Sequence, residues 1–208
     1  MTAARVGILG GSFNPPHLGH LVCAQEALDQ LGLDQVLLMP AGIPPHKELD
    51  DPGAEERLEL CRRATAREPR LEVSRLEIDR PGPSYTVDTL RTLHERSREA
   101  ELTFIAGGDM AQSLGSWHEP REVLRLARLA VAERAGAGRD DVLASLAPLA
   151  PPPGRVIFLD APRIDISSSM IRRRVAEGRP VRHLVPDAVA QRIAGAGLYR
   201  SPLVAAVR

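Results

Sequence analysis

The stretch ILGGSFNPPHLGHL, at residues 8–21, constrains the fold of this chain more than any other part of its sequence. Val6 to Leu9 is apolar and predicts a buried strand, which runs directly into the glycine pair Gly10-Gly11. Because glycine has no Cβ atom, this pair permits a tight turn and a close approach of the backbone to a ligand. From Leu18 to Leu31, apolar residues recur at helical spacing. The stretch therefore predicts a strand, a ligand-binding turn and a helix in direct succession.

Two histidines, His17 and His20, stand at the start of the predicted helix, on adjoining turns of one face. The N-terminus of a helix presents free N–H groups and the positive end of the helix dipole, which favour a phosphate. Imidazoles placed there can hydrogen-bond phosphate oxygens, and they carry positive charge when protonated. A lone histidine is more often an ordinary surface residue, but this pair beside the glycine turn indicates a phosphate site.

The rest of the chain alternates short apolar runs with helical patterns. We predict further strands at Gln35–Met39, Leu71–Ile78, Leu102–Ala106, Leu129–Ala132 and Val156–Leu159, the second of which is outer or irregular. We predict further helices at Ala54–Ala66, from Val87 to about Arg98 with Thr86 as N-cap, at Val123–Leu126, near Asp141–Ala147, from Ile166 toward Gly178, and around Asp187–Ala194. About six strands alternating with helices indicate an α/β protein with a Rossmann-like, doubly wound parallel sheet.

The length of 208 residues favours one domain over two, so we expect residues 1–208 to form a single domain. Residues 135–154 are rich in Gly, Ala and Pro, and we expect a segment of limited order there after a short helix. The sequence holds no GxGxxG motif, so a dinucleotide-dependent dehydrogenase is not supported.

Charge and cysteine content exclude several other classes. Lys and Arg together number 27, as do Asp and Glu, which gives no reason to expect nucleic acid or a membrane surface as a partner. Cys23 and Cys61 show no metal-site spacing and are too few for a disulfide framework. No run approaches the roughly 20 apolar residues of a membrane span, and the N-terminus enters a strand rather than a signal peptide. We therefore expect a cytoplasmic protein; its oligomeric state stays open, a homo-oligomer included.

Polar residues follow two of the predicted strands. Lys47 ends the loop AGIPPHK, and Asp109 comes after Gly107-Gly108. In open α/β sheets, ligands bind at the carboxyl ends of the strands, so Lys47 is a candidate phosphate ligand. Asp109 could simply cap the next helix.

Three more stretches could carry chemistry: SYTVDTL at residues 84–90, SLGSWH at 113–118 and ISSSMIR at 166–172. Trp117 lies in a Gly- and Ser-rich loop, where an aromatic ring can serve as a stacking platform. The serines of the last stretch can cap a helix, with Arg172 about one turn inside it. A capped helix and a solvated arginine run would be the ordinary explanation of each feature taken alone.

Taken together, these stretches resemble the (T/H)xGH nucleotidyltransferase superfamily. The fuller form GGSFNPPHLGHL, followed in order by PPHK, SYTVDTL, GGD…SW and ISSSMIR, resembles the nicotinate-nucleotide adenylyltransferases of NAD biosynthesis over almost the whole chain. Two positions depart mildly from that family's pattern: Gly108, where Ala is most frequent, and Ser169, where Thr is frequent. The second change keeps the hydroxyl group.

The resemblance implies a reaction in which the adenylyl group of ATP is transferred to nicotinate mononucleotide, giving nicotinate adenine dinucleotide and pyrophosphate. The 5′-phosphate oxygen that attacks the α-phosphorus is already ionised at neutral pH, so no general base is required. Catalysis then consists mainly of positioning and charge stabilisation. By resemblance, the catalytic residues are His17, His20, Lys47 and Arg172. Mg²⁺ is expected to arrive on ATP, held largely by phosphates and water, since no dedicated carboxylate cage is visible.

The resemblance also implies two sets of binding residues and no metal-ligating residues. For ATP they are Gly10, Gly11, Ser12, Phe13, His17, His20, Gly107, Asp109, Ile166, Ser167, Ser168 and Arg172. For the mononucleotide they are Ser12, Lys47, Tyr85, Thr86, Asp109, Trp117 and His118. No Lys or Arg falls within Ser84–Val87 or Ser113–His118, so backbone N–H groups at the helix start after Thr86 are the expected donors to a nicotinate carboxylate.

Two alternatives remain at the level of sequence. The phosphate acceptor could be another compound, such as phosphopantetheine or nicotinamide mononucleotide, although SYTVDTL and GGD…SW favour a pyridine nucleotide. Alternatively, the chain could be a nucleotide-binding regulator without catalysis. The presence of His17, His20 and Arg172 argues against the regulator.

Overall fold

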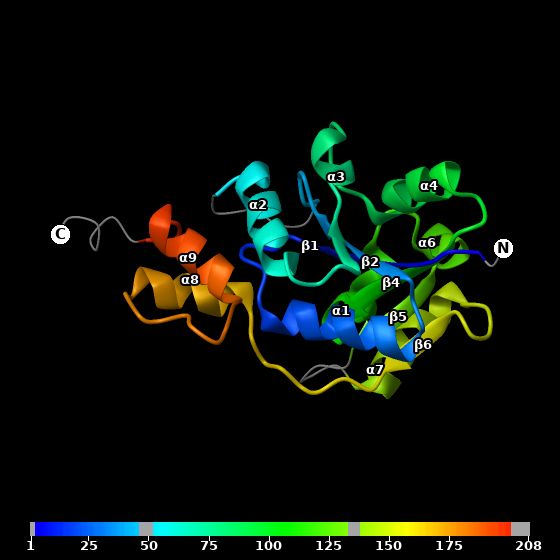
Figure 1. Ribbon diagram of the computed structural model, residues 1–208. Helices are drawn as coiled ribbons and strands as arrows, with labels where there is room; N and C mark the ends of the chain where they lie inside the picture. The colour runs from blue at the N-terminus through cyan, green and yellow to red at the C-terminus, as the bar shows by residue number, and fades with distance from the viewer. Residues whose placement is uncertain (1–2, 46–51, 133–137, 201–208) are drawn as a thin grey trace.

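A parallel sheet of six strands, in the order β3-β2-β1-β4-β5-β6, forms the centre of the computed structural model, which describes residues 3–45, 52–132 and 138–200 (Figure 1). This strand order confirms the predicted Rossmann-like, doubly wound fold. The strands are β1 Arg5–Gly11, β2 Gln35–Pro40, β3 Leu71–Val73, β4 Glu101–Gly107, β5 Arg128–Ala132 and β6 Val156–Leu159.

Helices cover both faces of this sheet. Successive strand residues point to opposite faces: Val6 and Ile8 of β1 pack in one core with α4, α6 and α7, whereas Leu9 packs in a second core with α1 and α2. The helical elements are α1 Leu18–Gln30, α2 Ala54–Thr65, α3 Leu76–Asp79, α4 Thr86–Arg96, α5 Gly108–Gln112, η1 Ser113–Ser116, α6 Pro120–Leu126, α7 Arg139–Leu146, η2 Ala147–Leu149, α8 Ser168–Ala176 and α9 Asp187–Gly195. Among the described residues, none of these helices is long and apolar enough to span a membrane.

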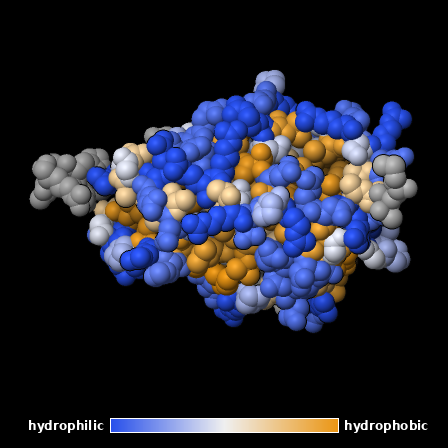
Figure 2. All heavy atoms as spheres, viewed as in Figure 1, coloured by the Kyte–Doolittle hydropathy of each residue, from blue (hydrophilic) through white to orange (hydrophobic). Residues whose placement is uncertain are grey.

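A third core lies where α2, α8 and α9 meet, on the left of the view in Figure 1. Its buried side chains are Leu60, Ala64, Ile171, Val181, Val185, Val189 and Ile193. The C-terminal part of the chain is therefore packed on α2, at the end of the sheet where β1 and β2 terminate. Figure 2 shows that hydrophilic residues cover most of the face seen in Figure 1, with apolar residues exposed between them near its middle.

One predicted strand was wrong in its second half. The strand predicted at Leu71–Ile78 ends at Val73, because Ser74 begins a turn in which its Oγ accepts a hydrogen bond from the Leu76 N–H at 3.2 Å. The apolar pair Leu76 and Ile78 belongs instead to the short helix α3. Edge strand β3 pairs with β2 alone, so little holds it in extended form beyond that point.

Helix starts also differ from the predictions in part. Thr86 is the first residue of α4 and Tyr85 is its N-cap, without a capping side-chain bond. Asp109 does not cap α5 but lies in its first turn, after Gly107. In contrast, Ser167 caps α8 as predicted, since its Oγ accepts from the Met170 N–H at 3.2 Å. The helix predicted near Asp141–Ala147 is α7, whereas residues 135–137 of the Gly-, Ala- and Pro-rich segment lie outside the described residues.

An ion pair between Glu56 of α2 and Arg192 of α9 provides a test of the C-terminal packing. The Arg192 guanidinium donates two hydrogen bonds of 2.7 Å to the Glu56 carboxylate and thereby lowers the pKa of Glu56 from its ordinary value of 4.5. A group with a lowered pKa stabilises the folded state above its unfolded pKa, and this stabilisation is lost as the pH falls through the folded pKa.

We therefore expect Glu56→Gln to lower the urea midpoint of unfolding at pH 7 by up to about 0.5 M, because partly exposed pairs are weak. The difference from the wild type should shrink toward zero at pH 3. Glu59→Gln is the matched control, since Glu59 is paired with Arg63 on the exposed side of the same helix. An equal difference at both pH values would contradict the assignment.

Candidate active site

The turn after β1 joins the sheet to α1 and spans residues 12–17. A Cβ atom on Gly10 would lie 3.2 Å from the Phe104 ring, so glycine is needed there for packing of strand β4. A Cβ atom on Gly19 would lie 3.1 Å from Nδ1 of His17. The glycine of HLGH therefore leaves room for the first histidine ring beside the helix.

The structure brings the two histidines into direct contact. Their rings stack with centroids 3.7 Å apart and planes inclined by 30°, and the Phe13 ring lies 4.9 Å from that of His20. His17 is only 2% exposed. The His17 backbone N–H donates to Nδ1 of His20 at 3.2 Å, so the proton of a neutral His20 ring resides on Nε2. His20 thus carries its donor on the atom that points away from the helix cap.

The start of α8 contacts the same turn from the far end of the sequence. Arg172 donates through Nη1 to the Asn14 carbonyl oxygen at 2.9 Å, and Ser168 donates through Oγ to the Pro15 carbonyl oxygen at 2.8 Å. Arg174, two residues on, instead bonds the Pro180 carbonyl oxygen at 3.0 Å. Of these two arginines, Arg172 alone reaches the turn of the histidines.

A second group of predicted residues gathers around α4. The Tyr85 and His118 rings lie 4.6 Å apart, whereas Trp117 packs edge-on against Phe104 at 5.7 Å. The Trp117 indole N–H also donates to Oγ of Ser113 at 3.1 Å. These contacts fix the orientation of Trp117 and leave it half-buried at the end of the sheet.

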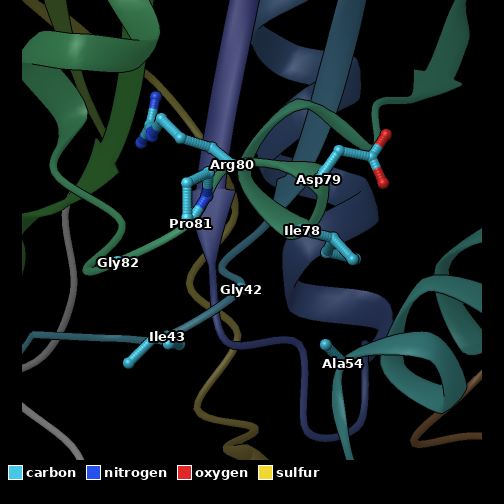
Figure 3. A pocket seen from close by; sticks show the side chains of 8 residues that line it. All are labelled: Gly42, Ile43, Ala54, Ile78, Asp79, Arg80, Pro81 and Gly82. Atoms are coloured by element: carbon cyan, nitrogen blue, oxygen red, sulfur yellow. The ribbon is translucent and has the colours of Figure 1, made fainter.

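The loop after β2 is held against the start of α4. The Gly42 N–H donates to Oγ of Ser84 at 2.9 Å, and Ile43 pairs with Pro83. Figure 3 shows Gly42 and Ile43 facing Ile78–Gly82 across an open pocket, with Ala54 of α2 at its edge. The pocket has a volume of about 310 Å³. This loop continues toward Lys47, which lies outside the described residues.

A network of hydrogen bonds connects α3 and the residue after it with the first turn of α4. Thr89 donates through Oγ1 to Glu77 at 2.6 Å, and Arg80 donates to Thr89 Oγ1 at 3.1 Å and to the Tyr85 carbonyl oxygen at 3.3 Å. Burial raises the pKa of Glu77, which is 7% exposed. Arg80 therefore places a cation next to the helix start, although it precedes SYTVDTL in the sequence.

Three other predicted residues lie at the end of β4, just after it, and just before α8. Gly107 ends β4, and Asp109 is exposed on α5. Ile166 packs against the third core, beside α8. Within the described part of the chain, no three His, Cys, Asp or Glu side chains are grouped so that they could hold a metal ion.

Sequence reasoning missed four residues that shape this site: Asn14, Arg57, Ser84 and Tyr199. The Tyr199 hydroxyl donates to Oδ1 of Asn14 at 2.7 Å, across 185 positions of sequence. Arg57 donates to the carbonyl oxygens of Ser12 and Gly42. A signal for Arg57 did exist, since it precedes Cys61 by four residues and so belongs to the buried face of its helix.

Comparison with known proteins agrees with this geometry. A family model described as cytidylyltransferase-like matches residues 8–174. A protein of Roseiflexus sp. (strain RS-1) named probable nicotinate-nucleotide adenylyltransferase is 48% identical, over 96% of this chain and 100% of its own length. A protein of the same name from Thermus thermophilus is 46% identical, over 94% of this chain and 100% of its own length.

Solved structures show the same fold. The Plasmodium falciparum nicotinic acid mononucleotide adenylyltransferase complexed with NaAD has a TM-score of 0.77, and the match covers 94% of this chain and 97% of that one. At 15% identity this likeness concerns the fold alone. The identities with the bacterial sequences reach further: the chain belongs to the cytidylyltransferase-like family and, within it, to the family of the nicotinate-nucleotide adenylyltransferases.

Proposed function

We propose that this protein transfers the adenylyl group of ATP to nicotinate mononucleotide, releasing pyrophosphate and forming nicotinate adenine dinucleotide. The observation that carries the proposal is the meeting of two phosphate-binding elements. The turn with His17 and His20 is bonded to the start of α8 through Arg172 and Ser168, about 150 residues away. The positive dipole ends of two helices, together with an arginine and two imidazoles, suit a polyphosphate.

In this proposal, the residues position the phosphates and offset their charge. His17 orients the attacking phosphate and the α-phosphate, and His20 stabilises the transferring and leaving phosphates. Lys47 and Arg172 offset charge on the polyphosphate, and Gly10, Gly11, Ser12 and Phe13 line its backbone side. Mg²⁺ bound to ATP would lower the charge of the phosphates, and phosphates and water would hold it, since the described residues form no group of metal ligands. In-line attack by an ionised phosphate oxygen then needs orientation rather than proton transfer.

The mononucleotide is assigned to the group around α4. Tyr85 and Trp117 would hold the pyridine ring, with His118 beside them, and the backbone N–H groups after Thr86 would receive its carboxylate. Asp109, in the first turn of α5 after β4, would contact the nucleotide. The contacts of Arg80 with Tyr85 and Thr89 support this assignment, because they add a cation close to a site for an anion. We further propose a single cytoplasmic nucleotidyltransferase domain for residues 1–208.

The proposal predicts a preference for the acid over the amide. With ATP, nicotinate mononucleotide should have a kcat/KM at least about five-fold above that of nicotinamide mononucleotide, since a hydrogen bond to a charged acceptor is stronger by roughly 1 kcal/mol or more. Pyrophosphate release measures both rates. Equal use of the two mononucleotides would contradict the substrate, and no release with any mononucleotide would favour a nucleotide-binding regulator.

Trp117→Ala tests which part of the pocket selects the acid. Loss of a stacking platform should raise the KM of both mononucleotides about five-fold or more, on the scale of base–aromatic stacking. The acid-over-amide ratio should stay within about three-fold of the wild type, because backbone groups rather than the indole ring read the carboxylate. Trp117→Phe, which keeps a stacking ring, is the control. If the acid-over-amide ratio of kcat/KM fell to near one in the alanine variant, the group that selects the acid would depend on Trp117 rather than on the backbone of α4.

A further inference from the structure

Arg57 is a buried cation in the middle of the structure. It lies on the sheet side of α2 and is 1% exposed, although arginine is seldom fully buried unless it is paired. Within residues 3–45, 52–132 and 138–200, no carboxylate forms an ion pair with its guanidinium or acts on its charge. By contrast, Arg63 on the same helix is exposed and bonded to Glu59 at 2.7 Å. Within the described part of the chain, an ion pair therefore does not explain the burial of Arg57.

Its hydrogen bonds join the two turns that lead into the candidate active site. Nη1 donates to the Ser12 carbonyl oxygen at 2.9 Å, in the turn after β1, and Nη2 donates to the Gly42 carbonyl oxygen at 3.1 Å, in the loop after β2. The adjacent strands already meet at the Ala41 N–H, which donates to the Gly11 carbonyl oxygen at 3.0 Å. One guanidinium thus fixes the spacing of both turns just beyond the sheet.

Two titratable groups act on the charge of Arg57, Cys61 and Tyr199, and both are neutral at physiological pH. Burial raises the pKa of the Cys61 thiol and of the Tyr199 hydroxyl above their ordinary values, so both groups remain protonated. Burial lowers the pKa of Arg57, but a guanidinium remains charged in proteins. Neutral carbonyl oxygens accept hydrogen bonds from Nη1 and Nη2 without cancelling the charge, and within the described residues the buried Nε has no hydrogen-bond partner. In a buried setting that charge acts over a longer range.

We propose that Arg57 is a positioning residue for adenylyl transfer, which holds the turns after β1 and β2 in register and whose buried charge is balanced by the phosphates of the substrates. The inference rests on the proposed function, which places phosphates at the turn after β1, where Ser12 lies. A charge fixed in advance needs no reorganisation when negative charge develops on the leaving pyrophosphate. Arg57 thereby acts on the reaction through its charge and through the backbone of the two turns, without contact with the reacting atoms.

Charge and geometry can be separated by two substitutions. Arg57→Lys keeps the charge and loses the fork, whereas Arg57→Gln keeps a hydrogen-bond donor and loses the charge. The dissociation constant of inorganic pyrophosphate, measured by titration calorimetry at pH 7.5, should stay within about three-fold of the wild type for the lysine variant. It should rise at least about ten-fold for the glutamine variant, the scale of one partly shielded charge. Arg63→Gln, which removes an exposed arginine from the same helix, should leave it unchanged.

The lysine variant alone gives a second test, should the glutamine variant not fold. A buried lysine has a lowered pKa and loses its charge at a pH where arginine keeps it. Relative to the wild type, the lysine variant should therefore bind pyrophosphate progressively more weakly from pH 7.5 to 9.5. Both proteins contain Cys61, Tyr199 and Arg172, so the pH effects of these residues cancel in the ratio of the two dissociation constants. The pH dependence of that ratio therefore reports on residue 57.

Two results would overturn the inference. Equal affinities of the lysine and glutamine variants, whether both weakened or both normal, would leave Arg57 a structural role only. A structural role only would also follow if the ratio of the pyrophosphate dissociation constants of the lysine variant and the wild type did not change with pH. The proposed function fails separately: a wild-type protein that binds pyrophosphate but forms no dinucleotide from ATP and nicotinate mononucleotide would refute the reaction, while the charge test on Arg57 would keep its meaning.

Discussion

His20→Ala should lower turnover by at least about 100-fold, the scale for loss of one electrostatic contact to the transition state. The reason lies in the tautomer of the ring. Because Nδ1 accepts the His17 backbone N–H at 3.2 Å, Nε2 is the donor that His20 can offer to a phosphate oxygen. Steady-state pyrophosphate release at saturating substrates measures the loss. His94→Ala, at an exposed histidine of α4, is the control and should be near normal.

The alanine substitution also removes the bond that caps α1, at a cost on the order of 1 kcal/mol in stability. His20→Asn separates the two roles, because an asparagine side-chain oxygen can replace Nδ1 as acceptor but offers no donor at the place of Nε2. We expect the asparagine variant to unfold at a temperature closer to the wild type and yet to remain about 100-fold slower. Near-normal turnover in a folded alanine or asparagine variant would remove His20 from the mechanism.

Arg172→Ala should reduce kcat/KM for ATP by about 100-fold, the second of the two large effects. Adjacent residues of a helix point about 100° apart, so the three arginines at positions 172–174 cannot all face the same ligand. Arg172 is the one bonded to the Asn14 carbonyl oxygen, at 2.9 Å, beside the histidine turn. Its guanidinium has five N–H donors, so that bond leaves further donors for phosphate oxygens.

Arg174→Ala is the matched comparison. Because its side chain bonds the Pro180 carbonyl oxygen in the loop after α8, its loss should change kcat/KM for ATP by no more than about three-fold, as for other surface positions. Both variants need a check of folding by circular dichroism. Similar losses at the two positions would show that the helix acts as a diffuse basic face and that Arg172 has no special place.

The sequence alone determined those features that depend on neighbours along the chain. The strand, glycine turn and helix of residues 6–31 form a continuous unit, so their order and type follow from local patterns. The two histidines are three residues apart, which places them on one helix face whatever the rest of the fold does. Alternation of apolar runs with helical patterns likewise predicted the parallel sheet, since parallel strands require crossover connections. Ser167 as the cap of α8 is also a local property.

Tertiary structure decided the features in which distant segments compete for the same space. The pattern at Leu71–Ile78 suits a strand, but β3 has a partner on one side only and gives way to α3 after three residues. Tyr199 reaches Asn14 only because the C-terminal segment packs on α2. In the sequence, Arg57 cannot be distinguished by residue type from the exposed arginines of the same helix. Its guanidinium is buried because the turns after β1 and β2 close over it in the folded protein. Burial depends on the assembled core and cannot be read from the helix sequence alone.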